Sequence, residues 1–180
     1  TTVAGAATQM VILDQPDSAV AGDAFSPSIW IEARDAFGNR ATSWSDSVRI
    51  VVDSGPSGGV VRHPVLGDRA EFLTNGGGPV YGALGGYEIE VAGTYRLRVV
   101  ADGGLSVALA PFTVRATTPE LLAKVSGGDE TGAVLQAFAA PLRVRVTDQF
   151  QNPVGGVKVA WVDQGGGAVR LGGFGGPAEV

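Results

Sequence analysis

A run of alternating apolar and polar residues that ends in a polar turn occurs twice in this chain, with the turns starting at positions 35 and 148. Residues 29–34 lead into the sequence DAFGN, and residues 142–147 lead into DQFQN. A period of two is typical of a strand with one buried face, and a repeat of 113 residues (positions 35 and 148) has the length of a whole sandwich domain. The pattern therefore predicts two tandem all-β domains and not a single enzyme core.

Short apolar or alternating runs recur along residues 1–116, separated by turns rich in Gly, Pro and Asp. No window places apolar residues at helical spacing over three turns, and Gly or Pro interrupts most windows of that length. Seven strands at this spacing predict a β-sandwich with essentially no helix beyond single turns. The expected strands are residues 9–13, 28–34, 48–52, 60–62, 70–72, 95–99 and 107–114.

The second copy of the pattern predicts a second sandwich over residues 117–180. Near the end of the chain, residues 166–170 align with residues 58–62, which places the last residues in the fifth strand. The counterparts of residues 73–115 are then absent, so we expect a sandwich without its last two strands, with an open core and unpaired edges. Three explanations stay open: a piece cut from a longer chain, a partner chain that supplies the strands, or an unusually small sandwich.

Charge and cysteine content argue against several classes of function. The net charge is −5 with no basic cluster, whereas nucleic acids and anionic membranes are bound by concentrated Lys and Arg. The chain has no cysteine, which removes disulfide scaffolds, thiolate nucleophiles and cysteine-based zinc sites. Glycine and proline interrupt the longest uncharged run. We expect no nucleic-acid partner and no membrane insertion of this segment.

One serine motif has the spacing of a hydrolase nucleophile but not its context. Residues 55–59 read GPSGG, and His63, the only histidine, follows. A nucleophile elbow stands between a strand and a helix, whereas this loop joins two expected strands. We interpret the motif as a turn and His63 as a surface residue at the end of a strand. The sequence predicts no enzyme activity, no catalytic residue and no cofactor.

The carboxylates are scattered and lack the spacing of a known Ca²⁺ loop, although distant loops can also supply the six or more oxygens that Ca²⁺ needs. The turn from Asp35 to Asn39 is one candidate contributor, and its repeat runs from Asp148 to Asn152. Asp and Asn in such turns commonly bond their own backbone. We therefore predict structural turns and no metal site.

Exposed aromatic rings are a candidate ligand platform, because sugar rings stack on Trp and Tyr faces. Trp30 alternates away from its apolar neighbours, Trp44 lies in a Ser-rich loop and Tyr81 lies in a glycine-rich loop. The alternative is that the tryptophans pack across sheet edges or between domains.

The repeated strand and turn resemble the bacterial immunoglobulin-like repeats of large surface proteins, including those of invasin and intimin stalks. In that family a Val-rich alternating strand is followed by Asp, two residues, Gly, Asn and Pro. Residues 144–154 are similar to this pattern, with Gln151 where Gly is usual, and the first copy keeps Gly38 but has Arg40 in place of Pro. Residues 93–95, GTY, resemble the tyrosine corner of such sandwiches, whose hydroxyl bonds to backbone.

The resemblance implies tandem immunoglobulin-like β-sandwich modules, the second incomplete at its C-terminus, at the cell surface or outside the cell. Such modules act as non-catalytic spacers in adhesin stalks, with neighbouring modules as partners and a protein or carbohydrate as receptor. Two other functions stay open. One is a carbohydrate-binding accessory domain of a secreted hydrolase, and the other is a filament or virion subunit completed by strand exchange.

Overall fold

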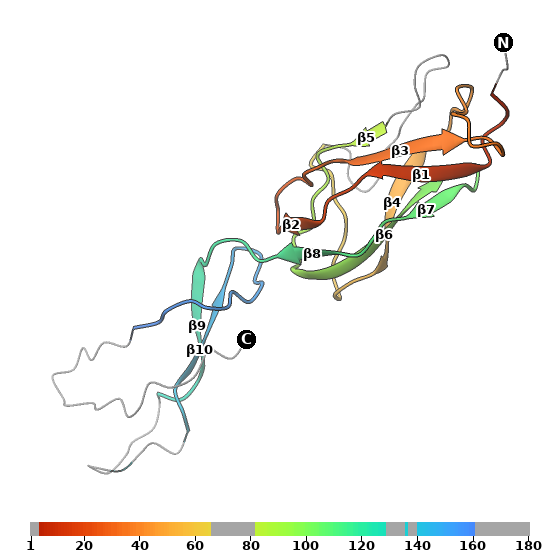
Figure 1. Ribbon diagram of the computed structural model, residues 1–180. Helices are drawn as coiled ribbons and strands as arrows, with labels where there is room; N and C mark the ends of the chain where they lie inside the picture. Colours follow the sequence, from red (N-terminus) through yellow and green to blue (C-terminus); the bar gives the residue numbers. More distant parts are fainter. Residues whose placement is uncertain (1–3, 66–81, 129–135, 137–139, 161–180) are drawn as a thin grey trace. The chain divides into compact units, whose positions relative to one another are not determined.

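The computed structural model describes residues 4–65, 82–128, 136 and 140–160 (Figure 1). Every regular element in these residues is a strand, so the fold is all-β. The chain separates into two compact units, Thr1–Arg115 and Ala116–Val180. Among the described residues, no helix has the length and apolar character needed to cross a bilayer.

The first sheet of unit 1 is antiparallel, with the strand order β1-β3-β5. Its strands are β1 Gln9–Asp14, β3 Ile29–Arg34 and β5 Gly82–Leu84. Ile31 pairs with Ile12, and a bulge follows between Ile12 and Asp14. The sequence predictions for β1 and β3 are confirmed to within one residue at each end.

The second sheet of unit 1 has the order β2-β8-β6-β4, and β7 also pairs with β6. Its strands are β2 Ser18–Val20, β4 Val48–Ser54, β6 Gly93–Ala101, β7 Ser106–Ala108 and β8 Phe112–Arg115. β2 runs parallel to β8, and the other pairs are antiparallel. The two sheets lie one behind the other in Figure 1.

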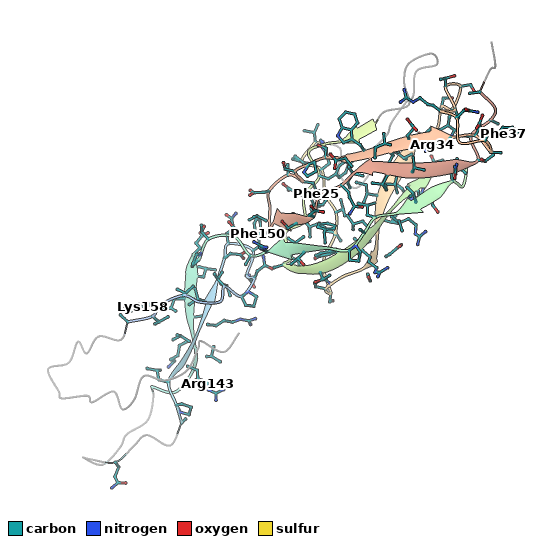
Figure 2. The ribbon with its side chains drawn as sticks, in the orientation of Figure 1. Phe25, Arg34, Phe37, Arg143, Phe150 and Lys158 are labelled. Atoms are coloured by element: carbon teal, nitrogen blue, oxygen red, sulfur yellow. The ribbon has the colours of Figure 1, made fainter. Side chains whose placement is uncertain are left out.

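The core of unit 1 is built from alternate positions of both sheets. Ile31 of the first sheet is 2% exposed, and Leu97 and Val99 of the second are fully buried. Phe25 lies inside the unit (Figure 2). Its ring packs edge-on against that of Phe112, with centroids 5.5 Å apart. Burial of each such side chain stabilises the fold by roughly 1.5–3 kcal/mol. This arrangement is typical of a β-sandwich.

The strand predicted at residues 60–62 is wrong. Only Arg62 pairs there, in a single antiparallel bridge with Glu88 that is closed by two backbone hydrogen bonds of 3.0 and 2.9 Å. A turn closed by Gly59 N–H and the Pro56 carbonyl precedes the segment, and Pro64 follows it. The segment between these breaks is too short for a ladder. The strand predicted at residues 70–72 lies outside the described residues.

The strand predicted at residues 107–114 is divided into β7 and β8. At the break, the side chain of Gln15 replaces strand pairing, since its Oε1 accepts the Ala110 N–H at 2.9 Å. Pro111 follows, and it has no N–H to donate to a ladder.

Unit 2 contains β9 Leu121–Ser126 and β10 Arg143–Thr147, an antiparallel pair. Val144 pairs with Lys124, and the register shifts between Arg143 and Val144. The pair therefore repeats β1 and β3, with a bulge at the equivalent place. The segment aligned with residues 58–62 lies outside the described residues.

Candidate functional site

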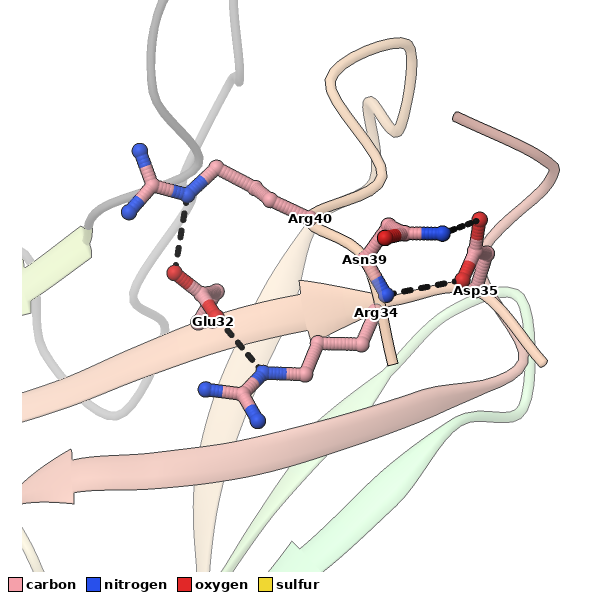
Figure 3. Close-up of polar contacts among 5 residues, drawn as sticks. All are labelled: Glu32, Arg34, Asp35, Asn39 and Arg40. Atoms are coloured by element: carbon pink, nitrogen blue, oxygen red, sulfur yellow. Dashed lines mark hydrogen bonds and ion pairs between the residues drawn. The ribbon is translucent and has the colours of Figure 1, made fainter. Parts of the chain in front are cut away.

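The turn after β3 is organised around the carboxylate of Asp35, which is 2% exposed (Figure 3). Its Oδ1 accepts hydrogen bonds from the backbone N–H groups of Phe37 and Asn39, both at 2.9 Å. Its Oδ2 accepts a bond from the side-chain amide of Asn39 at 3.2 Å. The backbone adds bonds from Asp35 N–H to the Asn39 carbonyl and from Gly38 N–H to the Asp35 carbonyl. The turn is thus closed by its own polar groups.

The turn after β10 repeats this arrangement. Oδ1 of Asp148 accepts the backbone N–H groups of Phe150 and Asn152 at 2.9 and 2.8 Å. Oδ2 accepts the Asn152 side-chain amide at 2.9 Å. Asp148 is fully buried and Asn152 is 5% exposed. We call each Asp and Asn pair with its turn a clamp: the Asp35 clamp and the Asp148 clamp.

Each clamp also holds the segment that leads into its own unit. Oδ2 of Asp35 accepts the N–H of Gly5 at 2.9 Å, and Oδ2 of Asp148 accepts the N–H of Thr117 at 3.0 Å. These donors lie 30 and 31 residues before the aspartates. Each carboxylate therefore ties the end of one strand to the approach of another.

Hydrogen bonding keeps both aspartates ionised. The Gly5 N–H, together with the amide and backbone of Asn39, holds the pKa of Asp35 below its ordinary value. Burial raises the pKa of Asp148, but bonds from the Asn152 side chain and the Thr117 N–H outweigh it, so that this pKa is also lowered. The carboxylate oxygens are occupied by N–H donors, which disfavours a Ca²⁺ role for the turns. No group of three or more His, Asp or Glu side chains suited to a metal ion occurs within the described residues.

A second polar cluster surrounds Glu32 on β3 (Figure 3). Oε1 of Glu32 accepts a bond from Arg34 Nε at 2.6 Å, and Oε2 accepts one from Arg40 Nε at 2.8 Å. Burial raises the pKa of Glu32, which is 5% exposed, but the two guanidinium groups outweigh it and lower the pKa. Arg145 and Pro153 occupy the positions of Glu32 and Arg40 in the second copy, so the cluster is not repeated.

The structure describes two of the three candidate aromatic residues, Trp30 and Trp44. Trp30 is 36% exposed and lies on the face of β3 opposite the buried Ile31. Trp44 packs against Ala33 and Ala41, which belong to the buried core. Tyr81 lies outside the described residues. A platform shared by all three rings therefore stays a prediction.

Packing around Tyr95 accounts for the GPSGG motif. The fully buried Tyr95 donates its hydroxyl hydrogen to the Val91 carbonyl at 2.8 Å, the bond expected of a tyrosine corner. A Cβ placed on Gly55 would lie 2.5 Å from the Tyr95 ring, and one on Gly59 would overlap the hydroxyl. Ser57 between them is exposed. The glycines therefore let the loop cover the ring, and the serine is a turn residue.

His63 is half-buried, which corrects the prediction of a surface residue. Its ring packs against the buried Tyr87, with centroids 5.1 Å apart, and its Nδ1 accepts the Val65 N–H at 3.1 Å. A shallow cavity of about 540 Å³ lies beside it, lined by residues that include the ion pair of Arg62 and Glu90 at 2.7 Å.

Sequence reasoning missed three features: the Gly5 and Thr117 tethers, the Glu32 cluster and the contact of the GPSGG glycines with Tyr95. Only the Glu32 cluster has a signal in the sequence, namely an acidic residue in an alternating strand with arginine two and eight positions later.

No model of a known protein family matches the chain, and no curated protein sequence is significantly similar to it. The residues and their geometry carry the functional conclusion.

Proposed function

We propose that this chain is a pair of immunoglobulin-like spacer modules of a bacterial cell-surface or secreted multidomain protein, without catalytic activity. The observation that carries the proposal is the repetition of one structural device in both units. The strand pair, its bulge and the clamp with its tethered lead-in segment recur at matching positions. Tandem modules require such a repeat, because each copy must receive the chain from the module before it.

The strand order of unit 1 supports the immunoglobulin-like assignment. In that fold the first, second and fifth strands share one sheet, and the third, sixth and seventh share the other. We assign β1, β3 and β5 of unit 1 as the first, second and fifth of these strands, and they form one sheet. We assign β4, β6 and β8 as the third, sixth and seventh, and they belong to the other sheet. The bond from Tyr95 near the start of β6 to the Val91 carbonyl adds the tyrosine corner of this fold.

The non-catalytic assignment is supported by the engagement of the reactive side chains. Glu32 is paired with two arginines, and Asp35 and Asp148 accept bonds from their turns. Ser57 lies in a loop whose glycines pack on Tyr95, and His63 packs on Tyr87. The three carboxylates and His63 thus have structural contacts, and Ser57 is an exposed turn residue, in place of the nucleophile and base pairing that catalysis needs.

Single-molecule pulling of the whole chain between marker domains tests the spacer function. A spacer module unfolds in one discrete step, and unit 1, Thr1–Arg115, should release about 40 nm of chain at roughly 3.5 Å per residue. Gradual lengthening without a step of that size would contradict the proposal.

The accessory-domain alternative is tested by binding to an array of saccharides. Binding of the unmodified chain that is lost in Trp30→Ala would favour this alternative.

A second candidate function, assembly by strand exchange, is favoured by exposed apolar residues in unit 2. Leu122 is 61% exposed although its counterpart Met10 is 5% exposed, and Leu142 is 44% exposed although its counterpart Ile29 is fully buried. Strands from another chain would cover such a face. Light scattering over a range of concentrations decides between the two. A discrete oligomer that Leu122→Asp disperses supports strand exchange, and a monomer at all concentrations supports the spacer.

A further inference from the structure

We infer that Asp148 fastens the linker between the two units, so that the backbone torsions of Ala116 are the hinge of this chain. The inference assigns the proposed spacer a residue that limits its bending, and in that sense it rests on the proposed function. Each hydrogen bond that supports it lies within a single unit.

The linker is bonded to unit 2 from Thr117 onward. The Thr117 N–H donates to Oδ2 of Asp148 at 3.0 Å, and Asp148 is fully buried. The Glu120 N–H then donates to the Thr147 carbonyl at 2.9 Å, and β9 starts at the next residue. A charge-assisted bond sheltered from water is stronger than an exposed one, so the Thr117 amide is held firmly.

The linker is bonded to unit 1 as far as Arg115. This residue ends β8, and its carbonyl accepts the Ala21 N–H at 2.8 Å. Arg115 also pairs with Val20 in the parallel ladder of β2 and β8. The last peptide group of unit 1 that is held by a hydrogen bond is therefore the one between Arg115 and Ala116.

Because peptide groups are planar, the two anchors determine how many backbone torsions between the units remain free. The Arg115 carbonyl fixes one peptide plane to unit 1, and the Thr117 N–H fixes the next plane to unit 2. Peptide groups are planar and rotate only at φ and ψ. Between the two planes lie φ and ψ of Ala116 alone. Release of Thr117 from Asp148 would add the torsions of the following residues up to the next anchor at Glu120.

The Asp35 clamp provides a matched control within the same chain. It makes the same set of bonds, but the segment it holds, at Gly5, is not the linker between the two units. In Asp148→Asn the amide oxygen can still accept the two backbone bonds of Oδ1. The amide nitrogen then faces the Thr117 donor, and the tether is lost. Asp35→Asn makes the same change in unit 1.

The test measures distances between the units in the full 180-residue chain. Because the chain has no cysteine, spin labels can be placed at Arg96→Cys on β6 and Arg145→Cys on β10, both exposed. Pulsed electron resonance then gives the distribution of label distances. We expect a broader distribution in Asp148→Asn than in the unsubstituted chain, and no broadening in Asp35→Asn. Equal widths in all three proteins would overturn the inference.

Ala116→Gly keeps the test decisive if Asp148→Asn fails to fold, because it loosens the hinge and leaves every clamp bond in place. A broader distance distribution in this variant supports the hinge, and an unchanged one overturns it. The Tm of Asp148→Asn and of Asp35→Asn shows whether each variant is less stable, independently of any change in the hinge. If Asp148→Asn lowers the Tm but leaves the distance distribution unchanged, the hinge inference is overturned. The unfolding steps under force would still test the spacer function separately.

Discussion

Two buried tyrosines of unit 1 differ in the hydrogen bonding of their hydroxyl groups. The hydroxyl of Tyr95 bonds to the Val91 carbonyl, whereas that of Tyr87 is buried and has no hydrogen-bond partner among the described residues. Burial raises the pKa of both phenols. One hydroxyl therefore stabilises the fold and the other costs free energy.

Tyr95→Phe and Tyr87→Phe should change stability in different directions. Loss of the Tyr95 hydroxyl leaves the Val91 carbonyl without its donor, and we expect the free energy of unfolding to fall by about 1 kcal/mol. Loss of the Tyr87 hydroxyl removes an unsatisfied group, so no change or a gain of up to about 1 kcal/mol is expected. Urea unfolding of the two variants measures both values, and equal losses would contradict the assignment.

The two clamps differ at the position that adopts a left-handed backbone. Gly38 has φ of 81°, and Gln151 at the same position of the second turn has φ of 67°. A residue with a Cβ is disfavoured there by roughly 1–2 kcal/mol, whereas glycine is not. The second clamp is therefore strained at a place where the first is relaxed.

Exchange of the two residues should move stability in opposite directions. Gln151→Gly should stabilise unit 2 by about 0.5–1 kcal/mol, and Gly38→Gln should destabilise unit 1 by about 1 kcal/mol. Hydrogen exchange of the amides in β10 and β3 reports on each unit separately in the full chain. A loss of protection in both variants would refute the account of strain.

The same elements show how much of the fold the sequence can predict. β1, β3, β4, β6 and β10 were predictable because each has alternating or apolar runs of five residues or more. β2 and β5 have three residues each, too few for a period to appear, and tertiary pairing alone defines them. The strand prediction at residues 60–62 rested on Val60 and Val61, but between a turn and a proline only Arg62 of this segment forms a bridge.

The clamps show the same limit at the site. The bonds within each turn follow from the local preference of Asp and Asn, and the sequence predicts them. The tether from Thr117 to Asp148 uses a backbone N–H 31 residues away, which any residue but proline carries. Such a donor leaves no signal in the sequence. Only the folded strands bring the two groups within bonding distance.

The buried carboxylates make the stability of the protein depend on pH. The pKa values of Glu32, Asp35 and Asp148 are all lowered in the folded state. A group with a lowered folded pKa stabilises the protein above its unfolded pKa, and this contribution is lost as the pH falls through the folded pKa. The ordinary values are 4.5 for Glu and 3.8 for Asp.

We therefore expect Tm to be steady near neutral pH and to fall below about pH 4. Asp148→Asn should start from a lower Tm and lose less on acidification, since one of the titrating groups is gone. Calorimetry between pH 7 and pH 2 measures both proteins. A Tm that holds or rises down to pH 2 would show that these carboxylates do not stabilise the fold.

The parallel pairing of β2 with β8 determines how unit 1 responds to tension along the chain. β8 ends unit 1, and β2 lies near its beginning, with Ser18 opposite Thr113 and Val20 opposite Arg115. Opposite pulls on the start of one parallel strand and the end of the other slide the strands along each other. Their hydrogen bonds are then loaded in shear, all at once, and do not open one after another as in a zipper. A module with this pairing resists tension along the chain with all the hydrogen bonds of the β2 and β8 ladder at once.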